Sequence, residues 1–401
     1  MGSVTAQIGG EFLNRYGHID AMRAFAVLLV VFSHAGLTFV PGGSGVTIFF
    51  VISGFIITYL LLREREKTGG FDVGGFYMRR LIKIAPPLFL IIVIPTLIYM
   101  ALGHSVNIVD FLGQIFFFLN WRYLDSDINV LPGSHVTWSL SIEEQFYLIF
   151  AIIWLFAVKS KHYLKVVSAL AGIVVVYSFI ARIVLYFGGA TNDRIYFGTD
   201  TRVEAIGIGT LVAIWYFTHR TSPRITGNQY SARHSHDAGK NVVAASDQRT
   251  VPTLGKTYIP VTALVLYLFS LVVRDETFRE TIRYSIQAIA AAMVILWGLT
   301  EVRSPLGQKF HDFLQWRFLQ VLGLASYSIY LLHDVLNKAL EPLFEHLPRL
   351  VSLPILVVLG IAGGVAIWKF IELPAQRFKD RHFASANAKS ERAKLERREA
   401  P

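Results

Sequence analysis

Two stretches of this sequence carry no Lys, Arg, Asp or Glu over more than the roughly 20 residues that a membrane-spanning helix needs. The first lies between Arg23 and Arg63, and the second covers residues 84–109. Soluble domains carry about 25% charged residues, whereas this chain of 401 residues has 16% charged and 53% hydrophobic residues. The sequence therefore predicts an integral membrane protein of the all-α class.

Ten segments have the length and hydropathy expected of transmembrane helices. They are residues 19–39, 45–62, 82–102, 139–157, 164–187, 202–218, 257–273, 284–300, 318–338 and 350–372. A Pro-Gly-Gly-Ser-Gly run at 41–45 predicts a tight break after the first segment. The first two spans should therefore pair as a helical hairpin.

The apolar segment 111–121 is too short to cross a bilayer easily. If it does not span, most Lys and Arg residues fall in loops on one side of the membrane. If it spans, Lys159, Lys161 and Lys165 face outward instead. Because cytoplasmic loops are enriched in Lys and Arg, we predict that 111–121 is a re-entrant or interfacial piece on the outer side. Both termini are then cytoplasmic.

The predicted domain organisation is simple. Residues 1–18 form a cytoplasmic N-terminus, residues 19–378 a membrane domain with a polar cytoplasmic loop at 219–256, and residues 379–401 a basic cytoplasmic tail. The net charge of +10 is concentrated in loops between apolar runs, which indicates membrane topology rather than nucleic-acid binding. The chain has no cysteine, and its histidines do not follow zinc spacings, so we expect no metal site.

Arg23 and His34 are ionisable residues that interrupt the first predicted span. Ionisable residues inside membrane helices are costly and often functional. At 100° per residue the two side chains lie within about 20° of one helix face, and about 16 Å apart along the axis. One face thus carries a cation near the inner leaflet and an imidazole toward the outer leaflet. Each residue taken alone is equally well explained by contact with lipid headgroups or with a neighbouring carbonyl.

The fourth predicted span brings two carboxylates, Glu143 and Glu144, close to the depth of His34. A carboxylate beside an imidazole orients it and raises its basicity. An acidic helix N-terminus also favours the helix dipole, and we expect one of the two glutamates to do only that.

Two further spans carry polar residues at their predicted outer ends. The sixth opens with Asp200-Thr201-Arg202, which fits either a capped helix start with a solvated ion pair or an acceptor contact. The ninth places Ser326, Tyr330 and His333 on one face, although aromatic residues at this depth are more often a headgroup belt.

A basic cluster, Arg79, Arg80 and Lys83, precedes the apolar part of the third span. Positive charge on the cytoplasmic side is the ordinary explanation. The functional explanation is a clamp for the phosphates of a cofactor that enters from the cytosol.

These motifs together resemble the membrane acyltransferase-3 family, over residues 17–380. The resemblance rests on Arg23 and His34, the run 45–55, Arg79-Arg80 with Pro86, the run 138–147, Asp200-Thr201-Arg202, the run 326–333, and Glu372-Leu373-Pro374 with Arg377. Lys83 stands where the family has a third Arg, which keeps the charge but loses a bidentate fork.

The resemblance implies an acyl-CoA donor, most simply acetyl-CoA, and a sugar hydroxyl in a cell-surface or lipid-linked glycan as acceptor. It implies His34 as the essential catalytic residue and Arg23 as its partner, in a bacterial inner (plasma) membrane. We expect no acyl relay to a fused hydrolase-like domain within this chain.

Further roles follow from combining this resemblance with the placement of the residues. Glu143 would orient His34, and the basic cluster would bind the phosphates of CoA. The substrate-binding residues would be Asp200, Arg202, His333 and Ser139. His34 would act either as a general base or as a carrier of the acyl group, and the sequence does not choose.

Two alternatives stay open. The acceptor could be a small molecule such as an antibiotic. From another class, buried Arg, His and Glu residues also build secondary transporters or exporters of glycans or polar metabolites. Transport is disfavoured because the halves of the chain show no inverted repeat, and because the polar residues spread from the inner to the outer edge. The sequence makes no prediction of oligomeric state.

Overall fold

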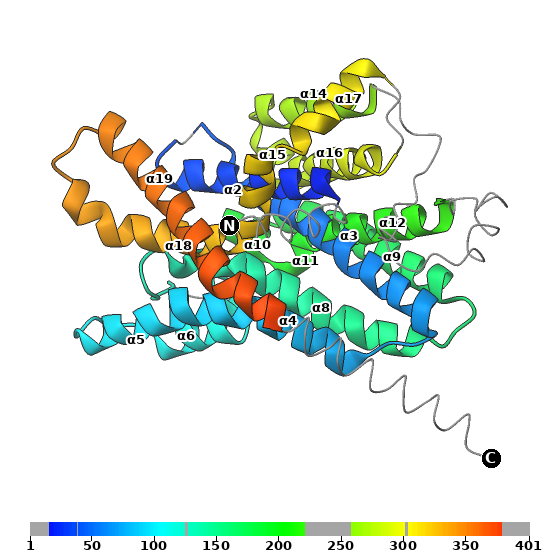
Figure 1. Cartoon of the computed structure of the whole chain (residues 1–401), viewed down its shortest axis with the longest axis horizontal. Helices are drawn as coiled ribbons and strands as arrows, with labels where there is room; N and C mark the ends of the chain where they lie inside the picture. The colour runs from blue at the N-terminus through cyan, green and yellow to red at the C-terminus, as the bar shows by residue number, and fades with distance from the viewer. Residues whose placement is uncertain (1–15, 38, 125–126, 221–257, 301–303, 379–401) are drawn as a thin grey trace, which may run out of the picture.

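The computed structural model describes residues 16–37, 39–124, 127–220, 258–300 and 304–378. Within these ranges the regular elements are all helices (Figure 1). The predicted all-α class is therefore confirmed for the described residues. The predicted N-terminus up to residue 15, the polar loop from residue 221 onward and the basic tail lie outside them.

Seven helical segments among the described residues are long and apolar enough to cross a membrane. They are α2 (Gly17–His34), α3 (Gly42–Thr68), Val73–Ala101, Ser134–Ala157, α9 (Tyr163–Phe187), α18 (Arg317–Phe344) and Arg349–Phe378. Three of these segments contain more than one helix. The segment Val73–Ala101 consists of α4 (Val73–Leu88), η1 (Phe89–Val93) and α5 (Ile94–Ala101). The segment Ser134–Ala157 consists of η2 (Ser134–Thr137) and α8 (Trp138–Ala157), and Arg349–Phe378 begins with α19 (Arg349–Ile367) and η3 (Trp368–Glu372).

Three shorter helices match the remaining predicted spans. They are α12 (Glu204–His219), α14 (Tyr258–Val272) and α16 (Arg283–Gly298). Every predicted span thus coincides with a helix, while the total of ten crossings and the side of each terminus stay predictions. The connecting helices are α10 (Asn192–Phe197), α11 (Thr199–Arg202), α15 (Glu276–Thr281) and α17 (Pro305–Leu314).

The segment 111–121 falls in two short helices, α6 (Ile108–Ile115) and α7 (Leu119–Arg122). The chain turns between them at Phe117, whose φ of 60° is unusual for a residue with a side chain. An ion pair of 2.8 Å between Arg122 and the fully buried Asp110 holds the two pieces together. Neither helix approaches the roughly 20 residues that a crossing requires.

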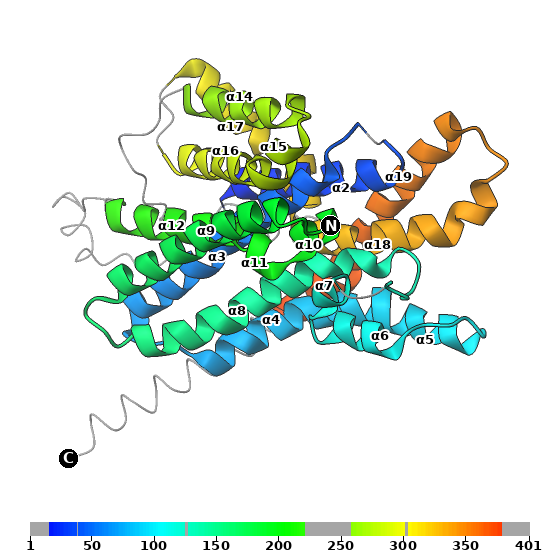
Figure 2. The same cartoon turned by 180° about the vertical axis from the view of Figure 1, so that it is seen from behind.

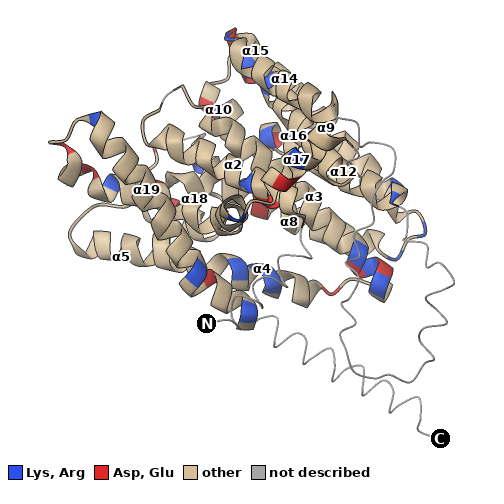
Figure 3. Ribbon diagram, turned by 45° about the horizontal axis from the view of Figure 1, so that its top comes forward, with Lys and Arg blue, Asp and Glu red and all other residues tan. Residues whose placement is uncertain are grey.

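Helix α2 occupies the centre of the molecule, packed against both α3 and α18 (Figures 1 and 2). Helix α3 packs in turn against α12, and α18 against α19. Figure 3 shows that charged residues gather around the first half of α4 and the last turns of α3, while long stretches of most helices carry none. The described bundle therefore has one strongly charged region beside largely apolar helices.

Close packing of α2 on α18 depends on a glycine. A Cβ atom on Gly323 of α18 would overlap the backbone carbonyl oxygen of Asp20 in α2. Small residues at such crossings let helix backbones approach closely, which is a main source of stability where lipid competes for apolar contacts.

A buried guanidinium joins the helices on the other side of α3. Arg182 of α9 is fully buried and ion-paired with Glu204. It also donates hydrogen bonds to the carbonyl oxygens of Thr281 (2.9 Å) and Thr201 (2.6 Å) and to the hydroxyl of Ser285 (2.7 Å). Because its donors are so fully occupied, we assign Arg182 a structural role.

Replacing Gly323 with Ala should destabilise the protein, because the new methyl group forces α2 and α18 apart. We expect the free energy of unfolding to fall by about 1–3 kcal/mol, seen as a lower midpoint of thermal unfolding in detergent. Gly172→Ala is the matched control, since a Cβ on this helical glycine meets open space. Equal midpoints for the two variants would contradict the packing argument.

Candidate active site

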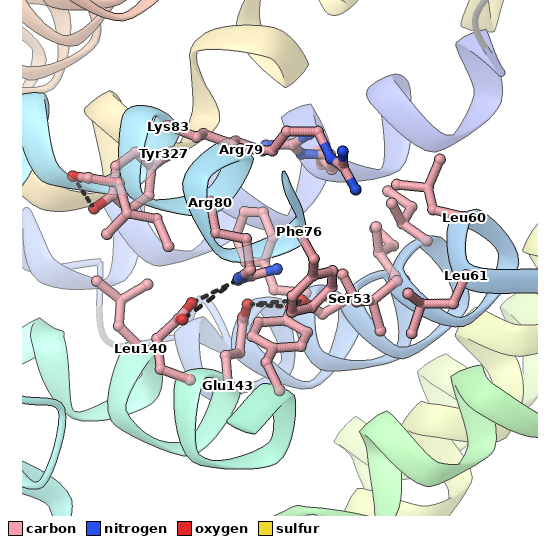
Figure 4. A pocket seen from close by; sticks show the side chains of 18 of the residues that line it. Ser53, Leu60, Leu61, Phe76, Arg79, Arg80, Lys83, Leu140, Glu143 and Tyr327 are labelled. Carbon is pink, nitrogen blue, oxygen red and sulfur yellow. Dashed lines mark hydrogen bonds and ion pairs between the residues drawn. The ribbon is translucent and has the colours of Figure 1, made fainter. Parts of the chain in front are cut away.

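A cavity of about 740 Å³ lies among α2, α3, α4, α8 and α18. Figure 4 shows side chains of α4 on one side of it, with Ser53 and Glu143 on the other. Six cationic and four acidic side chains line it: Arg23, Arg63, Lys67, Arg79, Arg80 and Lys83, with Glu64, Asp72, Glu143 and Glu144. The cavity reaches from the last turns of α3 to Ser139 and Tyr330, so it runs along the bundle.

The predicted basic cluster does line this cavity, together with Arg23. Two of its members are already paired with carboxylates. Arg80 lies 2.5 Å from Glu144, and Arg79 lies 3.2 Å from Glu64. A phosphate entering here would therefore compete with carboxylates for these guanidinium groups.

Glu143 does not contact His34, contrary to the role predicted for it. Its carboxylate accepts hydrogen bonds from Ser53 Oγ (2.6 Å) and from Tyr147 Oη (3.1 Å). The guanidinium of Arg80 lies 3.4 Å from the centre of the Tyr147 ring. The prediction relied on depth in the membrane, whereas the direction in which a helical residue points decides its partner. Glu143 belongs to the wall of the cavity.

His34 pairs with a second histidine from α18. Helix α2 ends at His34, earlier than predicted, and Gly36 follows with a φ of 105°. His34 Nδ1 lies 2.8 Å from His333 Nε2, and the two rings are parallel within 1°. His333 is fully buried, whereas His34 is exposed.

The hydrogen bonds of this pair fix where its protons lie when both rings are neutral. His333 Nδ1 is 3.1 Å from the carbonyl oxygen of Ile329, which can only accept. His333 Nδ1 therefore carries the proton, Nε2 accepts, and His34 Nδ1 must donate. The lone pair of His34 is left on Nε2. Since both nitrogens of His333 are engaged, we reassign it from substrate contact to support of His34.

A histidine–acid pair, which no sequence motif indicated, stands beside the His34–His333 pair. The ring of His135, in η2, lies 5.7 Å from the ring of His34. Its Nδ1 is 3.5 Å from Asp334 Oδ2, an ion-pair distance. Only weak signals in the sequence indicated this pair, because His135 lies just before a predicted span and Asp334 directly follows His333.

Tyr330 connects the cavity with the histidines. Its hydroxyl donates to the carbonyl oxygen of Val136 (3.0 Å) and lies 2.8 Å from Ser139 Oγ. Ser139 and Tyr330 both line the cavity, and the Tyr330 ring is 5.9 Å from that of His333. The predicted residue Ser139 therefore lies at the end of the cavity nearest to the histidines.

Arg23 lies farther along the same face of α2, as predicted. Its Nε donates to Ser326 Oγ at 3.2 Å. Because α2 is continuous from Gly17 to His34, Arg23 and His34 are separated by about 16 Å along the helix axis.

Asp200 and Arg202 have separate partners. Arg194 binds both carboxylate oxygens of Asp200, at 2.8 and 2.5 Å. This hydrogen bonding raises the pKa of Arg194 above its ordinary value. Arg202 is buried, donates to Thr47 Oγ1 (3.2 Å) and stacks 4.0 Å from the ring of Tyr284. Nothing in this arrangement brings the two residues to one binding group.

A metal centre has no support in the part of the chain that is described. None of the His, Asp and Glu groups there contains three side chains placed to hold a metal ion.

Comparisons with known proteins show to which family this chain belongs. A family model described as an acyltransferase domain, acyltransferase-3, matches residues 16–369. The chain belongs to the acyltransferase-3 family. No solved structure matches it.

Two kinds of relative in Staphylococcus aureus illustrate this membership. The O-acetyltransferase OatA of strain COL is 28% identical over 379 residues, which cover 91% of this chain and 58% of OatA. A putative O-acetyltransferase of the same strain is 34% identical over 212 residues, or 49% of this chain and 34% of the relative. The chain thus spans less than two thirds of the length of these curated relatives.

The exposure of the histidines in this member of the acyltransferase-3 family predicts their reactivity. Diethyl pyrocarbonate should modify His34 and His135, whose side chain is 42% exposed, before it modifies the fully buried His333. Peptide mass spectrometry of protein treated briefly in detergent measures this order. Equal modification of His333 would mean that the pair is open in solution.

Proposed function

We propose that this acyltransferase is an integral membrane O-acetyltransferase of the bacterial plasma membrane. It would take the acetyl group of cytosolic acetyl-CoA and pass it to a sugar hydroxyl in a cell-surface or lipid-linked glycan. The observation that carries the proposal is the chain of side-chain contacts from the cationic cavity, through Tyr330 and His333, to the exposed His34.

The cavity suits a phosphorylated donor. Its volume lies in the range of about 300–1,000 Å³ that is common for small-molecule sites. Guanidinium groups bind phosphates through two parallel hydrogen bonds. Arg79 and Arg80 would exchange their present carboxylate partners for the phosphates of CoA. The pantetheine arm would then extend toward Ser139 and Tyr330, which end the cavity near the histidines.

The chemistry at His34 follows from its proton positions. With Nδ1 donating to His333, Nε2 presents a lone pair to either an acetyl carbon or an acceptor hydroxyl. A thioester is an activated acyl donor, so the residues present can supply the nucleophile or base by themselves.

Substitution of His34 tests the catalytic assignment. We expect His34→Gln to lower acceptor-dependent release of CoA from acetyl-CoA by at least about 10²-fold, with soluble oligosaccharides from bacterial cell-wall glycan as acceptor. His346→Gln, a change at an exposed histidine on the segment after α18, should leave the rate unchanged. Wild-type rates in folded His34→Gln protein would overturn the assignment. Acetyl-CoA-independent movement of oligosaccharides into vesicles would favour the transporter.

Substitution of Arg79 tests the donor site. Arg79→Gln should raise the apparent KM for acetyl-CoA about tenfold with little change in kcat, because a charge-assisted hydrogen bond contributes about 1.5–3 kcal/mol. Acetyl-pantetheine lacks the nucleotide phosphates, so its KM should not respond. Arg349→Gln, at an exposed arginine, is the control. A fall in kcat alone would contradict the phosphate clamp.

A further inference from the structure

The imidazoles of His34 and His135 are neighbours, and each contacts a different partner. His34 is backed by the neutral ring of His333, 2.8 Å away. His135 is backed by the carboxylate of Asp334, 3.5 Å away. The ring centres of His34 and His135 are 5.7 Å apart, so one reacting group could contact both imidazoles.

The partners of the two imidazoles, Asp334 for His135 and His333 for His34, suit different steps of a transfer reaction. A carboxylate stabilises the positive charge that an imidazole gains when it takes a proton. A second imidazole, which itself donates to a backbone carbonyl, offers no negative charge for that purpose. His135 is therefore the better proton acceptor, whereas His34 is an oriented neutral nucleophile.

The position of His135 is fixed by the backbone around it. Gly133 has a φ of 82°, and a Cβ atom there would overlap the carbonyl oxygen of Asp334. This close approach docks the turn before η2 directly on α18. The remaining charged group nearby on α18 is Lys338, which is paired with Glu341 at 3.1 Å. The side chain of His135 is nevertheless 42% exposed, so an acceptor can reach it.

We propose that His135, positioned by Asp334, is the general base that activates the acceptor hydroxyl, while His34 carries the acetyl group. The proposal rests on the O-acetyltransferase function proposed above. It assigns a proton-transfer role to a pair that the sequence motifs did not indicate, and it divides the two halves of the reaction between two histidines.

The steps balance as follows. His34 Nε2 attacks the acetyl carbon, the carbon–sulfur bond breaks, and CoA leaves as a thiolate that takes a proton from water. The acceptor oxygen then attacks the acetyl carbon while its proton passes to His135 Nε2. The carbon–nitrogen bond breaks, its electron pair returns to His34, and His135 releases the proton to water.

The test separates the two half-reactions in purified full-length protein. With acetyl-CoA alone, wild type and His135→Gln should both release a burst of CoA of about one equivalent. They should also hold an acetyl group that hydroxylamine traps. With cell-wall oligosaccharides added, turnover by His135→Gln should fall about 10²-fold. His34→Gln should lose both the burst and the turnover.

Further variants distinguish chemistry from structure. Asp334→Asn should slow turnover, but should add nothing in a protein that already carries His135→Gln, because Asp334 acts through His135. Added imidazole should restore turnover to His135→Gly, since the site is open to solvent, whereas a merely structural defect would not respond. His346→Gln again serves as the control.

The results distinguish failure of the His135 assignment from failure of the proposed function. Unchanged turnover in His135→Gln, or loss of its burst, would overturn the assignment of His135 while wild-type activity left the proposed function standing. Absence of CoA release by wild type with every acceptor would overturn the proposed function, and this inference with it.

Discussion

The close packing of α2 against α18 is the interaction on which the site depends. In lipid, helices are held together by van der Waals packing and by hydrogen bonds between them, and Gly323 lets these two backbones meet at Asp20. Two side-chain hydrogen bonds then cross the same interface. Arg23 reaches Ser326 at the cavity, and His34 reaches His333 at the other end. One helix pair thus fixes both a cationic group and the imidazole proposed as catalytic, and any shift between the helices would disturb both together.

Two arginines that line the cavity, Arg79 and Arg80, are each paired with a carboxylate, and this pairing lowers the free-energy cost of placing their charges there. A lone charge moved out of water costs several kcal/mol unless a partner offsets it. Glu64 and Glu144 supply that compensation to Arg79 and Arg80. If a phosphorylated donor binds here as proposed, its phosphate would have to displace a carboxylate, and its affinity would reflect a difference between two ion pairs.

Sequence patterns predicted the positions of the helices better than they predicted which side chains contact one another. The uncharged runs located the helices, because lipid tolerates few charges, and the helical period correctly placed Arg23 and His34 on one face. The partners of His34 and Glu143 were not predictable in this way. Membrane depth can be estimated from position along a helix, but the facing direction depends on how helices rotate and pack. His135 was missed for a related reason, since it lies in a short turn where hydropathy carries no signal.

The hydroxyl of Tyr330 has a consequence for the membrane itself. It donates to the carbonyl oxygen of Val136 and lies against Ser139, at the place where the charged cavity ends and the histidines begin. A hydrated channel continuous from one face of the bilayer to the other would leak protons and dissipate the energy stored across the membrane. Under the proposed function the donor arm has to pass the Tyr330 hydroxyl, so this hydrogen-bonded point would have to admit the arm while excluding a continuous column of water.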